Sequence, residues 1–194
     1  MLPGISKIFF LKKFFSVLIV GFAIKIMDDY IDQDIDVIKN EPNLYIALEY
    51  GGLPYALLLL SLAAVIDLDA AISLFLSSFA VGMVGNLTVK MPSGLYGFFE
   101  SIIVILLGII LFKSEMLSSL FIMAAIQLWD DFLDYEKDNM SKKNLAFLLG
   151  KVECLLLAII FFLLTVFFDY VKAITSIIAM HIIIYIIKLL GNQR

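Results

Sequence analysis

The chain has 194 residues, of which 62% are hydrophobic and only 16% are charged, whereas soluble domains are about 45–50% apolar and about 25% charged. The formal net charge is −4, and no basic stripe runs along the chain, so we expect no nucleic-acid partner. This composition predicts an integral membrane protein whose single transmembrane domain, residues 1–194, contacts the lipid bilayer.

Apolar segments follow one another along almost the whole chain. A bilayer core of about 30 Å needs roughly 20 apolar residues per helix, and continuous apolar runs favour helices over the alternating strands of a β-barrel. The sequence therefore predicts an all-α bundle of about seven transmembrane helices, the sixth of them either tilted or broken near Gly150. The expected spans are 9–27, 44–66, 69–89, 95–113, 115–133, 145–168 and 170–190.

Two short segments hold ten of the eighteen acidic residues. "DDYIDQDID" begins at Asp28 and "DDFLDYEKD" begins 102 residues later at Asp130, and both follow the pattern Asp-Asp-x-x-Asp-x-x-x-Asp. Each copy comes at the end of an apolar segment. The sequence therefore predicts two pseudo-repeats, roughly 9–113 and 115–190, which each deliver one acidic helix end to a shared cavity.

The distribution of basic residues indicates the orientation of these acidic ends. Seven spans place both acidic segments and the C-terminus on one membrane face. Nine Lys and Arg residues lie near that face and five near the other. Because positive residues are enriched in cytoplasmic loops, we expect a multi-pass protein with its acidic segments on the cytoplasmic face.

The spacing of the aspartates predicts a binding site for a divalent cation. In a helix, Asp28, Asp32 and Asp36 are four residues apart and Asp29 is three residues before Asp32, so these four are expected to line one face. Like charges at this spacing repel one another, and carboxylates near hydrocarbon are costly. Magnesium is a hard cation, held through oxygen by one or two carboxylates plus substrate phosphates. Two such sites facing each other would clamp a diphosphate.

A calcium loop and a solvated loop are the alternatives to a magnesium site in the acidic segments. An EF-hand calcium loop is excluded, because Val37 stands in place of the turn glycine and Asn43 in place of the bidentate glutamate. Acidic loops that are simply solvated remain as the alternative without a ligand. The same spacing in both copies counts against it.

Three sequence elements in the same order resemble those of the UbiA-type intramembrane prenyltransferases. "MDDYIDQDIDVIKNEP" looks like their first aspartate-rich motif, and "DDFLDYEKDNMSKKNLAFLLG" is similar to their second. Between them, "NLTVKMP" resembles their Tyr-x-x-x-Lys element, with Asn86 at the tyrosine and Lys90 at the lysine. Family members usually have more helices, so this chain would be a short member that lacks the first and the last. Asp28 also stands at the usual asparagine.

The resemblance implies Mg²⁺-dependent transfer of a prenyl group from an isoprenoid diphosphate to an acceptor within the membrane. It implies that Asp32, Asp134 and Lys90 are catalytic. The metal ligands that it implies are Asp28, Asp29, Asp32, Asp36, Asp130, Asp131, Asp134 and Asp138. The diphosphate contacts that it implies are Lys90, Asn86, Lys39, Lys142 and Lys143.

Other functions stay open at the level of sequence. A membrane terpene cyclase would ionise the same diphosphate but quench the cation within the substrate. A cation transporter would use the acidic segments at a pore mouth, and a non-catalytic membrane protein is a further alternative. Because the chain is short, a second copy closing the cavity as a homo-oligomer is a further hypothesis.

Overall fold

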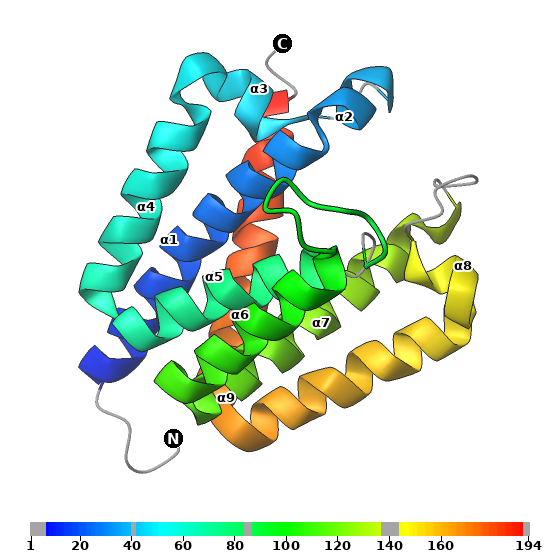
Figure 1. Ribbon diagram of the computed structural model, residues 1–194. Coiled ribbons are helices and arrows are strands. Elements are labelled where there is room, and N and C mark those ends of the chain that lie inside the picture. Colours follow the sequence, from blue (N-terminus) through cyan, green and yellow to red (C-terminus); the bar gives the residue numbers. More distant parts are fainter. Residues whose placement is uncertain (1–6, 40–41, 84–86, 137–143, 192–194) are drawn as a thin grey trace. The chain divides into compact units, whose positions relative to one another are not determined.

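The structure is a computed structural model that describes residues 7–39, 42–83, 87–136 and 144–191. Within these ranges every regular element is a helix, and the one β-type pairing is an isolated bridge between Lys90 and Tyr96. The prediction of an all-α chain is therefore confirmed for the described residues. In chain order the elements are α1 (Lys7–Ile31), α2 (Gln33–Lys39), α3 (Leu44–Leu48), η1 (Glu49–Gly51), α4 (Gly52–Ile66), α5 (Leu68–Gly82), α6 (Gly97–Phe112), α7 (Ser114–Leu133), η3 (Asp134–Glu136), α8 (Leu145–Leu149) and α9 (Lys151–Gly191) (Figure 1).

Three helical stretches of the described chain are long and apolar enough to cross a membrane, judged by length and composition. They are Leu44–Ile66, Ser114–Leu133 and Lys151–Leu189. The apolar helices α5 and α6 are shorter. A chain with such helices has the character of a membrane protein.

The chain forms two compact units. Unit 1 comprises Met1–Ile72 and Ile174–Arg194, and unit 2 comprises Ser73–Ala173. Within unit 1, α1 packs along α4 (Figure 1). The last part of α9 also approaches α1 closely, because a Cβ atom added at Gly21 would lie 2.7 Å from Ile183 Cδ1. Within unit 2, α6 packs against α7.

The buried face of α1 recurs in α7 with an offset of 102 residues. The buried positions that correspond are Ser16, Val17, Val20, Ala23, Ile26 and Asp29 in α1, and Ser118, Ser119, Ile122, Ala125, Leu128 and Asp131 in α7. From the second position of each set onward, the buried positions recur every three residues, so the buried stripe winds gradually around each helix. The internal repeat therefore extends from the aspartates to the packing surface of the helix that carries them.

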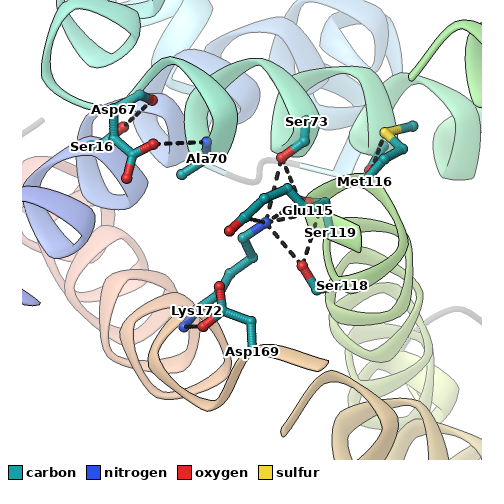
Figure 2. Close-up of polar contacts among 11 residues, drawn as sticks. Ser16, Asp67, Ala70, Ser73, Glu115, Met116, Ser118, Ser119, Asp169 and Lys172 are labelled. Atoms are coloured by element: carbon teal, nitrogen blue, oxygen red, sulfur yellow. Dashed lines mark hydrogen bonds and ion pairs between the residues drawn. The ribbon is translucent and has the colours of Figure 1, made fainter. Parts of the chain in front are cut away.

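A second pair of aspartates marks the repeat at a helix junction. Asp67 separates α4 from α5 in an extended conformation (φ −150°, ψ 97°), and its Oδ1 accepts a hydrogen bond of 3.0 Å from the Ala70 amide. Asp169 interrupts α9 with nearly the same angles (φ −155°, ψ 90°) and accepts one of 2.9 Å from the Lys172 amide (Figure 2). Each aspartate caps the helix that follows it.

Three predicted segments differ in detail from the helices observed. The segment 44–66 is divided into α3 and α4 by the 3₁₀ turn η1, where φ of Glu49 is 51°. The segment 69–89 is shorter than predicted, because α5 ends at Gly82 and residues 87–89 form a turn. There, the Gly97 amide donates to the Val89 carbonyl oxygen at 3.0 Å. The segment 145–168 is broken at Gly150, where φ is 107°, in agreement with the break expected near this residue.

Candidate functional site

The first acidic segment continues the helical register of α1 beyond its end. The Asp32 amide donates to the Asp28 carbonyl oxygen and the Asp36 amide to the Asp32 carbonyl oxygen, each at 3.0 Å. These are the i to i−4 bonds of an α-helix. Asp28, Asp32 and Asp36 therefore follow one another on successive turns, as the sequence predicts.

Asp29 has surroundings different from those of Asp28. Asp28 is exposed, whereas Asp29 is only 1% exposed. The Asp29 carboxylate lies 2.8 Å from Lys25 Nζ and accepts a hydrogen bond of 2.6 Å from the Leu44 amide. Burial raises the pKa of the Asp29 carboxyl, while Lys25 and the Leu44 amide act to lower it. The expectation that all four aspartates share one face therefore does not describe Asp29, which packs toward α3.

Asn43 joins this inward-facing aspartate to the next helix. Its Nδ2 donates to the Asp29 carbonyl oxygen and to Asp36 Oδ2, both at 2.7 Å. Its Oδ1 accepts from the Ile46 amide at 2.8 Å, which makes Asn43 the N-cap of α3. We call the two hydrogen bonds that Asn43 and Leu44 donate to Asp29 the first clasp.

The second repeat forms the same clasp from its own residues. The Leu145 amide donates to Asp131 Oδ2 at 3.0 Å, and Asn144 Nδ2 donates to the Asp131 carbonyl oxygen at 3.0 Å. Asn144 Oδ1 accepts from the Ala146 amide at 2.8 Å and so caps α8. This pairing is the second clasp. In the position of Lys25, the second repeat has Gln127, whose Nε2 lies 3.5 Å from Asp131 Oδ1.

The two clasp asparagines were not among the residues predicted from sequence. The signal for them is the dipeptide Asn-Leu, whose leucine begins a five-residue apolar helix in each repeat. An asparagine before an apolar run predicts a helix N-cap. It does not predict that the same side chain also binds an aspartate one loop earlier.

The other predicted site residues are distributed between the units. Asp32 and Asp36 in unit 1 and Asp134 in unit 2 are partly buried, whereas Asp130 is exposed. Two predicted diphosphate contacts are exposed as well, Lys39 at the end of α2 and Lys90 in the loop before α6. Asn86, Asp138, Lys142 and Lys143 lie outside the described residues.

The carboxylate oxygens of the aspartates are the ligands that magnesium prefers. In the described part of the chain, however, no three His, Cys, Asp or Glu side chains lie close enough together to hold a metal ion. Magnesium needs only one or two carboxylates when substrate phosphates supply further oxygens. Asp28 and Asp32 in one repeat, and Asp130 and Asp134 in the other, offer that number of carboxylates.

Aromatic side chains surround the end of α7. Lys151 Nζ lies 5.5 Å from the ring centroid of Phe132 and 5.4 Å from that of Tyr135, within the range of a cation–π contact. Tyr135 also stacks on Phe147, with the centroids 4.7 Å apart. In unit 1, Tyr30 meets Tyr45 edge to face at 4.9 Å.

A buried lysine forms a separate polar cluster within unit 2. Lys172 Nζ lies 2.5 Å from Glu115 Oε2 and donates to Ser119 Oγ at 2.8 Å and to Ser118 Oγ at 3.0 Å (Figure 2). Ser73 Oγ is 3.4 Å away, and Ser73 and Ser119 hydrogen-bond to each other at 2.8 Å. This cluster joins the helices α5, α7 and α9.

Comparisons with protein-family models, curated protein sequences and solved structures found no match for this chain. The family resemblance therefore depends on the three sequence elements quoted above. In each unit the candidate site consists of one clasp and the aspartates beside it.

Proposed function

We propose that this protein is a membrane prenyltransferase, which transfers a prenyl group from an isoprenoid diphosphate to an acceptor and requires Mg²⁺. One observation carries the proposal: the helix ends of α1 and α7 present the same aspartates, beside the same clasp, in two separate repeats. Such duplication is what a diphosphate held by a pair of metal ions requires. The resemblance to the UbiA-type enzymes supports the same reaction.

Each repeat contributes one set of metal ligands in this proposal. Asp32 and Asp134 are the central ligands, and their neighbours in the two motifs complete the sets as the resemblance implies. Mg²⁺ held by these residues would neutralise the charge of the diphosphate and so make it a better leaving group. Exposed Lys90 and Lys39 add positive charge to the same group. Asn86, Lys142 and Lys143 are proposed as its further contacts.

The proposed reaction begins with heterolysis of the bond between the prenyl C1 atom and the diphosphate oxygen. The electron pair leaves with the diphosphate, and the prenyl group becomes an allylic cation. The acceptor then attacks C1 and loses a proton. Apolar helices would enclose the tail and exclude water, and the ring of Tyr30, within the first motif, is suited to stabilise the cation.

The proposed membrane arrangement has seven spans and a cytoplasmic acidic face. Two of the five lysines assigned to the opposite face, Lys13 and Lys172, are 3% and 0% exposed. Both lysines lie within helices, Lys13 in α1 and Lys172 in α9, and their side chains are buried in the protein. Neither of these two lysines is therefore a loop charge, which supports the proposed orientation because the rule concerns basic residues in loops.

The test is to incubate purified protein in lipid nanodiscs with labelled prenyl diphosphates and to follow diphosphate release with and without Mg²⁺. We expect release that disappears when Mg²⁺ is chelated and returns when it is restored. A cyclic hydrocarbon formed without acceptor would identify a terpene cyclase instead. Absence of release for every chain length, together with ion flux in proteoliposomes, would replace the proposal by a cation transporter.

A further inference from the structure

We propose that Asn43 and Asn144 are positioning residues of the diphosphate site, which hold the metal-binding aspartates in place without touching metal or substrate. This inference rests on the proposed function, because it assigns the site its supporting residues. Both asparagines are buried, with exposed fractions of 9% and 3%. Their side chains bind other parts of the protein rather than solvent.

Asn43 is suited to this role by the three groups that it joins. One is the carbonyl oxygen of Asp29, in the last turn of α1, where carbonyl groups have no partner within the helix. The second is Asp36 Oδ2, a predicted ligand oxygen. The third is the Ile46 amide at the start of α3. A single side chain thus ties together the helix end that carries Asp28, the last aspartate of the motif and the following helix.

The second clasp is an independent occurrence of the same arrangement. Asn43 is 14 residues after Asp29, whereas Asn144 is 13 residues after Asp131. The loops that the two clasps close therefore differ in length by one residue. Since the two hydrogen bonds to the aspartate are the same despite this difference, the clasp geometry does not follow from a fixed loop.

Asp29 and Asp131 complete the clasps. Each uses one carboxylate oxygen to accept the amide of the leucine that follows its asparagine. The carboxylates beside them, Asp28 and Asp130, are exposed, and Asp28 Oδ2 accepts a hydrogen bond of 3.3 Å from Lys25 Nζ. Of the two adjacent aspartates that begin each motif, the first is therefore exposed, whereas the second accepts a hydrogen bond that holds the helix end.

Supporting contacts of this kind are known to affect metal affinity. Removing a partner that orients a metal ligand typically weakens metal binding by about 10-fold to 100-fold. We expect Asn43→Ser and Asn144→Ser to show this effect. Serine retains an N-cap acceptor for the short helix, but its shorter hydroxyl side chain cannot replace the amide that reaches the aspartate. The substitution thus separates capping from positioning and adds no charge.

The experiment measures the affinity for Mn²⁺ alone by electron paramagnetic resonance, together with the Mg²⁺ dependence of diphosphate release and the unfolding temperature. The matched controls are Asp67→Ser and Asp169→Ser, which replace caps in the same two repeats away from the motifs. We expect each asparagine variant to raise the Kd for Mn²⁺ about tenfold. The control variants should leave it unchanged at similar unfolding temperatures.

The possible outcomes separate this inference from the proposed reaction. Wild-type turnover together with unaltered Mn²⁺ affinity in both asparagine variants would overturn the positioning role and leave the reaction standing. Wild-type protein that binds Mn²⁺ but releases no diphosphate would overturn the reaction, and the Mn²⁺ affinities would still decide the positioning role. Wild-type protein that binds no Mn²⁺ would overturn both.

Discussion

Lys172 of α9 and Glu115 of α7 form an ion pair inside unit 2, with 2.5 Å between Nζ and Oε2. The lysine side chain is completely buried, whereas the glutamate side chain is 29% exposed. The ammonium group also donates to the Glu115 carbonyl oxygen at 2.9 Å. One charged group therefore joins the main chain and the side chain at the start of α7 to the middle of α9.

This difference in burial predicts an order of destabilisation. Removing one partner of a buried pair costs about 3–5 kcal/mol, because the other charge stays buried without compensation. We expect Glu115→Gln to lower the free energy of unfolding more than Lys172→Met, since the ammonium is the more deeply buried charge. The double variant should cost less than the sum of the two. Unfolding in detergent micelles measures all three, and equal single effects would contradict the expected order.

The central aspartates are expected to be essential for the proposed reaction. Asp32→Ala or Asp134→Ala should abolish diphosphate release while leaving the protein inserted in the membrane, because each removes a ligand oxygen that Mg²⁺ requires. Asp34→Ala is the matched control, because Asp34 is exposed and lies off the line formed by Asp28 and Asp32. Release of labelled diphosphate is the measurement. Normal turnover in either of the first two variants would refute the assigned roles.

The backbone at Glu49 predicts a stabilising substitution. Glu49 ends α3 with φ at 51°, and Gly150 ends α8 with φ at 107° at the corresponding place in the second repeat. Residues with a side chain are strained in this region, whereas glycine is not. We expect Glu49→Gly to stabilise the protein by about 1 kcal/mol and Gly150→Ala to destabilise it by a similar amount. The unfolding temperatures in micelles should therefore change in opposite directions.

The helix caps Asp67 and Asp169 provide a further test of the repeat. Replacing either by alanine removes an acceptor for an amide in the first turn of the following helix, which typically costs about 0.5–2 kcal/mol. Asparagine keeps the acceptor, so Asp67→Asn and Asp169→Asn should retain most of the stability. Chemical unfolding of the four variants compares the two junctions directly. Alanine variants as stable as the asparagine variants would show that the caps contribute little.

Much of the helical architecture follows from local sequence patterns. Apolar runs predict helices, and the two acidic motifs predict the repeat whose buried positions the structure extends through α1 and α7. The junction at Asp169 coincides with the boundary drawn between two apolar segments. These features are predictable because they depend on residues within one helix or on its ends.

The difference in burial between Asp28 and Asp29 could not be predicted in the same way. Helical spacing places neighbouring residues about 100° apart, but only the position of α3 decides which of them is buried. The burial of Lys172 was missed for a related reason. A lysine in an apolar run is expected to extend toward the membrane surface, and the serines that surround it come from two helices other than its own.

The assignment of helices to the two units has a consequence for how the molecule is assembled. The last part of α9 belongs to unit 1, and most of α5, its counterpart in the other repeat, belongs to unit 2. The second repeat thus contributes the end of α9 to unit 1, and the first repeat contributes most of α5 to unit 2. If the chain were cut at the start of α7, each unit would be made of residues from both fragments. The two repeats therefore exchange helices, as the subunits of a domain-swapped dimer do.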